Sequence, residues 1–205
     1  SMGSAREATI NGVLEQVQSL QDGTNENMDT TVTLVAFGSQ VNTLTEFLPV
    51  QEFDMALLDN YAPRGCTAMY DGVGQTIDSF LAHPDADNEN ASFLLIIISD
   101  GAENASLRYS AADVASKIKA AQATGRWTVT YMGANQDLSA VADKLNINLS
   151  NMSTFTTTGV DGYKGAMGQV FNASNSYMSV RGMGTASVDN FYTNITCDNT
   201  PVKKS

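Results

Sequence analysis

The sequence is poor in histidine and in basic residues, and each shortage argues against a class of function. Only one histidine, His83, occurs among 205 residues. A histidine-based zinc site or a Ser-His-Asp triad is therefore not expected, because one imidazole would have to fill every role. Eleven Lys and Arg against 22 Asp and Glu give a net charge of -11, which repels phosphate backbones and anionic lipid. Nucleic acid is not expected as a partner.

Cysteine and long apolar runs are also scarce. Two cysteines, Cys66 and Cys197, are too few for a disulfide framework, and we expect free thiols in a reducing compartment. The longest apolar run, Phe93 to Ile98, has six residues, far fewer than the roughly 20 of a membrane helix. No signal peptide is recognisable at the start of the chain. These features predict a cytoplasmic protein without membrane insertion.

Helical and strand patterns alternate along most of the chain, whose apolar share of 42% is enough for a buried core. Strands are predicted at residues 31–37, 41–48, 93–99, 127–132 and 148–153. Helices are predicted from a capping box at Ser4–Glu7 to Asp22, from Met69 to His83, around Ala112–Ile118, and over 138–145 and 162–178.

The strand patterns indicate how the sheet is built. The run from Phe93 to Ile98 has no polar alternation, which is typical of a central parallel strand covered by helices on both faces. The segment 41–48 alternates and follows a short turn, so we expect an antiparallel strand at the sheet edge. The predicted fold is α/β with a mostly parallel sheet in three layers. We assign residues 1–180 to this domain and residues 181–205, rich in Gly, Thr and Asn, to a tail.

Three oxygen-bearing side chains are predicted at the carboxyl edge of this sheet, where open α/β sheets bind ligands. Asp100 ends the most buried strand, Thr67 lies between a glycine-containing loop and a helix, and Ser1 precedes the first helix. Carboxylate and hydroxyl oxygens suit Mg²⁺ or Mn²⁺. Other interpretations stay open at this point: Thr67 as a helix N-cap, Asp100 as a turn cap, and Ser1 as part of a cloning scar.

Two motifs resemble those of the von Willebrand factor A (vWA) domain family, in its bacterial and phage branch. They are Arg64-Gly-Cys-Thr-Ala-Met-Tyr-Asp71 and Ile98-Ser-Asp-Gly101, and the resemblance covers residues 1 to 180. The family's metal-ion-dependent adhesion site joins an Asp-x-Ser-x-Ser loop to a distant Thr and a distant Asp. The resemblance implies that Ser1, Thr67 and Asp100 bind Mg²⁺ or Mn²⁺, with Ser1 as the last Ser of the loop.

The sequence departs from the family at its N-terminal end. The first strand and the Asp and first Ser of the loop are absent from these residues. In the family that strand lies mid-sheet, so its absence would open a slot between unpaired backbone groups. Three explanations stay open: upstream residues that are omitted, a truncated chain, or a strand donated by a partner. Of the neighbouring polar residues, we expect Asp71 to be structural, and Glu103 and Asn104 to shape the rim of the site.

The resemblance implies a non-catalytic protein-binding module. Its cation would engage an Asp or Glu of a partner protein in a larger assembly, in the cytoplasm of a bacterial or phage-infected cell or in a virion. One alternative is a structural subunit of an assembly, contacting neighbouring subunits and carrying a vestigial metal site. The other is a hydrolase in which Asp100 binds a water-activating metal. We expect no enzyme, because the sequence has no nucleophile with a base, no second carboxylate cluster and no phosphate-binding loop.

Overall fold

The computed structural model describes residues 6–23, 28–62, 65–157 and 159–193, and it confirms the predicted α/β class. Helices and strands follow in the order α1 (Arg6–Asp22), β1 (Thr31–Phe37), β2 (Val41–Pro49), α2 (Met69–Ala82), β3 (Phe93–Ser99), α3 (Ala111–Ala123), β4 (Trp127–Ala134), α4 (Leu138–Leu145), β5 (Met152–Phe155) and α5 (Gly159–Gly182). Short 3₁₀ turns connect them, among them η3 (Met55–Leu58) and η5 (Leu149–Asn151).

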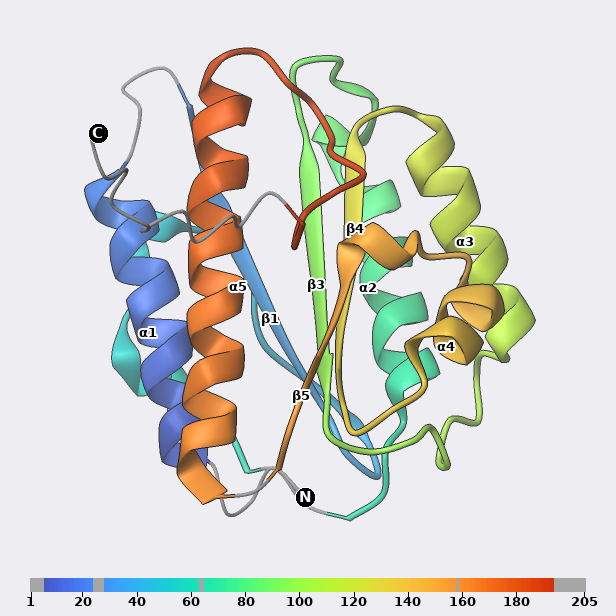
Figure 1. Ribbon diagram of the computed structural model, residues 1–205. Coiled ribbons are helices and arrows are strands. Elements are labelled where there is room, and N and C mark those ends of the chain that lie inside the picture. The colour runs from blue at the N-terminus through green and yellow to red at the C-terminus, as the bar shows by residue number, and fades with distance from the viewer. Residues whose placement is uncertain (1–5, 24–27, 63–64, 158, 194–205) are drawn as a thin grey trace, which may run out of the picture.

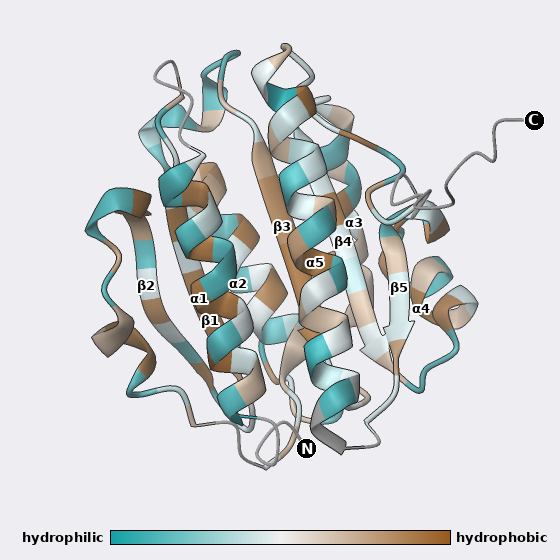
Figure 2. Ribbon diagram, turned by 60° about the vertical axis from the view of Figure 1, so that its left-hand side comes forward, coloured by the Kyte–Doolittle hydropathy of each residue, from teal (hydrophilic) through white to brown (hydrophobic). Residues whose placement is uncertain are grey.

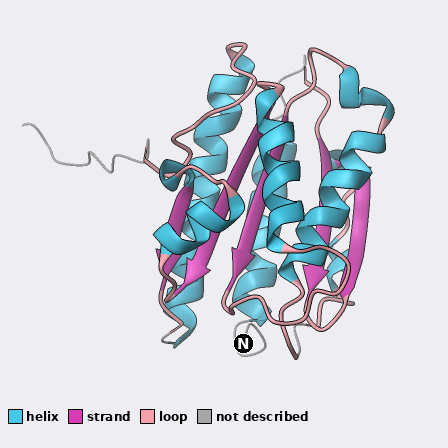
Figure 3. Cartoon of the chain, turned by 90° about the vertical axis from the view of Figure 1, so that its right-hand side faces the viewer, coloured by secondary structure: helices cyan, strands magenta, loops and turns pink. Residues whose placement is uncertain are grey.

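The strands lie between two layers of helices (Figure 1, Figure 3). α1 and α5 cover one face, and α2, α3 and α4 cover the other. Alternate strand residues feed the two cores, because neighbouring side chains in a strand point to opposite faces. Ile97 packs with Ile77 and Ile118 on the α2 and α3 side. Ile96 packs with Val170 on the α5 side.

The strands form two sheets instead of one. β3, β4 and β5 are parallel neighbours, whereas β1 and β2 form an antiparallel pair. Among the described residues no hydrogen-bonded ladder joins β1 to β3, although the two strands lie next to each other between the helix layers (Figure 2). The expected slot in the middle of the sheet is therefore present, with β2 as the antiparallel edge strand.

A short segment before α2 connects the carboxyl ends of β1 and β3. The Ala68 N–H donates to the carbonyl of Gly38, which follows β1, over 2.7 Å. The preceding residue, Thr67, lies against Gly101, two residues after the end of β3. β1 and β3 therefore end at the same edge and run in the same direction.

The positions of β5 and α1 differ in detail from the sequence-based expectation. Residues 148–153 were predicted as a strand, but the Asn148 side chain accepts a hydrogen bond from the Ser150 N–H and starts the η5 turn, so that β5 begins at Met152. The capping box at Ser4 lies outside the described residues. In α1 the buried positions are Ala8, Gly12 and Val17, while the predicted apolar face is only half-buried.

Part of the predicted tail packs on the domain. Arg181 still belongs to α5, which is longer at both ends than the predicted 162–178. Beyond it, Phe191 is 3% exposed, and its N–H donates to Asn151 Oδ1 over 2.8 Å. The Val188 N–H donates to Thr128 Oγ1 on β4. Residues from 194 onward lie outside the described part of the chain. None of the described helices combines the length and the hydropathy that crossing a bilayer requires.

Two glycines test the contact between α1 and α5. A Cβ at Gly12 would lie 2.5 Å from the Cβ of Met167 on α5, whereas a Cβ at Gly165 would have no atom within 4 Å. We expect Gly12→Ala to lower the free energy of unfolding by about 1–3 kcal/mol, because α1 must move away from α5. Gly165→Ala should raise it by up to about 1 kcal/mol through helix propensity. Urea unfolding of both variants measures the difference, and equal effects would contradict this packing.

Candidate functional site

Thr67 and Asp100, both predicted as metal ligands, lie at the carboxyl edge of β3. Asp100 directly follows the strand, and Gly101 comes next. A Cβ at Gly101 would lie 2.8 Å from Thr67 Oγ1, so the Thr67 hydroxyl rests against the backbone beside Asp100. Ser1, the third predicted ligand, lies outside the described residues. The structure thus brings two of the three predicted oxygen donors to one place.

A tyrosine hydroxyl from α5 orients Asp100, which is half-buried. The Tyr163 hydroxyl donates to Asp100 Oδ2 over 3.0 Å. Burial raises the pKa of Tyr163 to about 12, and the hydrogen bond to Asp100 and the carboxylate's charge add to the rise. Burial also raises the pKa of Tyr61, and the charge of Asp100 contributes there too. Both phenols therefore stay protonated near neutral pH. Sequence reasoning placed Tyr163 only in an apolar stripe and missed its hydroxyl.

Asn104 holds Thr67 in place through two backbone contacts. The Thr67 N–H donates to Asn104 Oδ1 over 2.8 Å, and the Asn104 N–H donates to the Thr67 carbonyl over 3.0 Å. Thr67 is not the N-cap of α2, because that position is Ala68, which makes no side-chain cap. The helix-cap interpretation of Thr67 is therefore wrong, and its hydroxyl has no role at the start of the helix.

Two carboxylates connect α2 and the loop after β3 in opposite directions. Glu103 of the loop accepts from the Tyr70 N–H at the start of α2 over 2.9 Å, and also from the backbone of Ala105 and Ser106. Asp71 of α2 accepts from three successive loop N–H groups, at residues 107, 108 and 109, over 2.8–2.9 Å. These contacts make Asp71 structural and place Glu103 at the rim.

The pKa values of both carboxyl groups lie below their usual range. Burial alone would raise the pKa of Asp71 and of Glu103, but the backbone hydrogen bonds to their ionised forms outweigh it. The Tyr70 N–H is one of the orphan donors at a helix start, so Glu103 serves as a cap from a distant loop. The loop beside Asp100 is therefore held rigidly only while these groups are ionised.

The carbonyl of Gly101 is fixed by two side chains from the ends of β3 and β4. It accepts from Ser99 Oγ over 2.8 Å and from Gln136 Nε2 over 3.1 Å. Gln136 in turn accepts from the Tyr131 hydroxyl over 2.6 Å. Sequence reasoning missed Gln136, and no motif marks it, because its role depends on β3 and β4 lying side by side.

The donor set of this site limits its chemistry. The described part of the chain contains no group of three or more His, Cys, Asp or Glu side chains able to hold a metal. Thr67 and Asp100 offer one hydroxyl and one carboxylate, which fit a hard cation that keeps several waters, such as Mg²⁺. Cys66, next to Thr67, is an exposed free thiol with no basic partner in the described residues, while Cys197 lies outside them.

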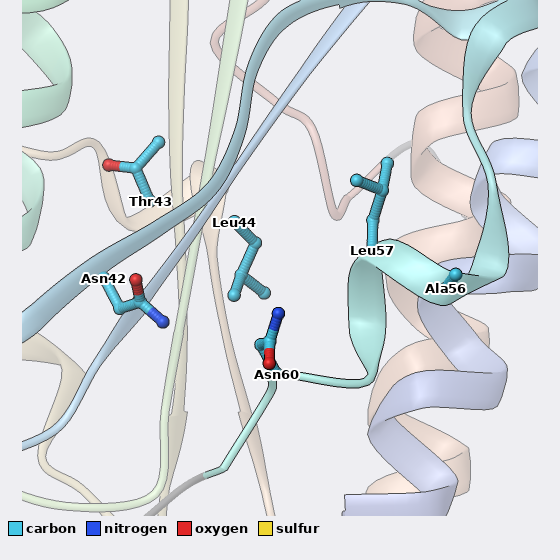
Figure 4. Close-up of a pocket in the computed structure, with 6 residues that line it drawn as sticks. All are labelled: Asn42, Thr43, Leu44, Ala56, Leu57 and Asn60. Carbon is cyan, nitrogen blue, oxygen red and sulfur yellow. The ribbon is translucent and has the colours of Figure 1, made fainter.

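A hollow of about 410 Å³ lies elsewhere, between β2 and η3. It is lined by Asn42, Thr43, Leu44, Ala56, Leu57 and Asn60 (Figure 4). Neither Thr67 nor Asp100 contributes to it. Its lining contains amide and hydroxyl groups but no charged side chain, so it offers no ligand for a cation.

Comparison with known proteins gives structural neighbours only. No family model and no curated protein sequence matches the chain. A solved structure of proximal thread matrix protein 1 from the mussel byssus superposes with a TM-score of 0.58 at 16% identity, and a von Willebrand factor type A protein from Catenulispora acidiphila with 0.54 at 16%. The chain has a vWA-like fold.

The two neighbours are longer than this chain. Each match covers 82% of the chain but only 42% and 38% of the neighbours, so the chain spans about two fifths of their length. At this identity the likeness shows the vWA-like fold alone. It agrees with the order of elements predicted from the sequence, while the metal site depends on the geometry of Thr67 and Asp100.

The two rim carboxylates predict an acid-sensitive stability. Because their folded pKa values are lowered, they stabilise the fold above the unfolded values of about 4, and this contribution is lost as the pH falls through the folded pKa. We expect the double variant Asp71→Asn/Glu103→Gln to be less stable by about 1–3 kcal/mol at pH 7. Its stability should also fall less between pH 5 and pH 2.

Urea unfolding at several pH values measures both effects. Leu107→Ala is the matched control, because this side chain belongs to the same loop and is 97% exposed. The control should follow the wild-type curve. An unchanged pH dependence in the double variant would contradict the role given to these carboxylates.

Proposed function

We propose that this vWA-like domain is a non-catalytic protein-binding module that uses Mg²⁺ or Mn²⁺. Asp100 and Thr67 hold the cation, together with Ser1, and an Asp or Glu of a partner protein completes its coordination. The observation that carries the proposal is the position of the Thr67 hydroxyl against Gly101, directly beside Asp100. The two residues are 33 positions apart in the sequence, and only the fold brings them together.

The charge of the site explains why a partner carboxylate would bind. A divalent cation with one protein carboxylate keeps a net positive charge and has coordination positions to spare. The chain itself carries a net charge of -11, so an acidic partner is repelled unless a cation intervenes. Binding of such a partner should therefore depend strictly on the metal. Mg²⁺ would lend Lewis acidity to the contact, while the protein orients the ligands through Tyr163 and Asn104.

A second candidate is a structural subunit of an assembly, with a vestigial metal site. One of the two structural neighbours is a matrix protein of the mussel byssus, which is an example of this fold in a structural material. The described residues also supply only one carboxylate to the site. This candidate needs contacts with neighbouring subunits and no cation. A hydrolase that uses Asp100 is disfavoured, since the described residues place no second carboxylate or histidine beside it.

The proposed setting is an assembly in the cytoplasm of a bacterial or phage-infected cell, or a virion. This setting comes from the family resemblance of the two motifs, and the acidic surface is compatible with it. It predicts a protein partner rather than nucleic acid.

A metal titration tests the proposed site. Mg²⁺ and Mn²⁺ at 100 times Kd should raise the free energy of unfolding by about 2.7 kcal/mol, because the metal binds only the folded state. Asp100→Asn and Thr67→Val should reduce or abolish this rise. The matched control is Asp143→Asn, an exposed carboxylate on α4, which should keep it. Thermal unfolding in the presence of the metals or of EDTA provides the measurement.

The outcomes separate the candidates. A rise that is lost in Asp100→Asn but kept in Asp143→Asn supports the metal-dependent module. No rise in the wild-type chain, or an equal rise in Asp100→Asn, contradicts it and leaves the structural subunit as the better candidate.

A further inference from the structure

The edge of β3 that faces β1 carries backbone groups without a ladder. The Phe93 N–H donates to the Arg126 carbonyl next to β4 over 2.9 Å. In a parallel pair the backbone groups of alternate residues point to the same side, so those of residues 93, 95, 97 and 99 face β4. The N–H and C=O groups of Leu94, Ile96 and Ile98 therefore point toward β1.

β1 presents a matching edge from the other side. Ala36 is paired with Asn42 of β2, and the neighbouring Gly38 N–H donates to the Gln40 carbonyl over 3.0 Å. The backbone groups of Ala36 thus face β2, and those of Val35 and Phe37 face β3. No ladder joins the two edges within the described parts of the chain.

The spacing of the two edges exceeds that of paired strands. Cα atoms of β1 and β3 are more than 8 Å apart along nearly all of their length, whereas paired strands lie about 4.8 Å apart. Both strands end at the same edge, because Ala68 binds Gly38 and Thr67 lies against Gly101. A strand between them could therefore be parallel to both.

Burial of the strands shows what the gap costs. All eight residues of β4 are buried, including the polar Thr128 and Thr130. In β3 only Ile97 and Ser99 are buried, although five of its seven residues are Leu or Ile. No residue of β1 is buried. β4 differs from both in having a strand on each side, so the partial exposure follows from the unfilled position and not from polar side chains.

We propose that another polypeptide supplies an apolar β-strand that pairs between β1 and β3, parallel to both. The strand would lie under α1 and α5 on one face and under α2 on the other, since Ile96 and Ile98 pack toward Ala8 and α5 while Phe37 packs against α2. It therefore needs apolar side chains on both faces. This is strand addition at two edges at once, in which backbone hydrogen bonds supply the affinity.

The sequence of residues 1–205 offers no second candidate for this position. Its longest apolar run already forms β3. The segments outside the described residues are polar: 24–27 reads Thr-Asn-Glu-Asn, and 194–205 contains Asn, Thr, Asp, Pro and Lys. A strand covered on both faces could not carry those side chains without leaving them unpaired.

Hydrogen exchange of single amides, followed by NMR in EDTA, tests the proposal independently of the metal site. The probe is a peptide with the sequence of β4 (Trp127–Ala134), a strand buried on both faces here, with two lysines added at each end. The control peptide has proline at three alternate positions and is unable to donate those hydrogen bonds. The same strand joined ahead of residue 1 by a Gly/Ser linker provides a second arrangement with high effective concentration.

In the chain alone, the amides of Leu94, Ile96 and Ile98 should exchange at least tenfold faster than those of Leu95 and Ile97. The probe, free or linked, should slow Leu94, Ile96 and Ile98 at least tenfold, while the proline peptide should not. Two results would overturn the proposal. One is equal protection of both sets in the chain alone, and the other is no added protection in either arrangement.

Discussion

The exchange of hydrogen bonds between α2 and the loop after β3 is the contact on which the candidate site depends. Glu103 caps the start of α2, and Asp71 of α2 binds the loop N–H groups in return. Asn104 in the same loop holds Thr67 by its backbone. Because each partner fixes the other, Thr67 and Asp100 keep their places although neither helps to cap the helix. The ionised carboxylates make this arrangement strong, and acid weakens it.

The divided sheet is the second constraint, and it meets the first at the same edge. The segment Thr67–Ala68 spans the carboxyl ends of β1 and β3 exactly where no ladder connects them. Packing of the helix layers and this one segment therefore hold the halves together. A strand added between them would end beside Asp100, so that filling the gap and completing the coordination of a cation would occur at one edge of the molecule.

Much of the fold and part of the site could be predicted from local patterns. The uninterrupted apolar run of β3, the alternation of β2 and the helical spacing of α2 are short-range signals, and each predicted element is present. Misses arose where long-range contacts decide. β5 begins later than expected because Asn148 starts a turn, and Tyr163 fits an apolar stripe although its hydroxyl reaches Asp100. Gln136 matches no motif, since its role exists only where β3 and β4 are adjacent.

The sequence by itself determined the class of fold, the residue types of the candidate site and the acidic balance that makes a cation useful, because periodicity, side-chain chemistry and charge belong to the chain. Only the tertiary structure decided that Thr67 lies beside Asp100, that Glu103 instead of Thr67 caps α2, and that β1 and β3 are left unpaired. Those facts concern residues far apart in the chain. Their distances are set by how helices and strands pack, which no local pattern records.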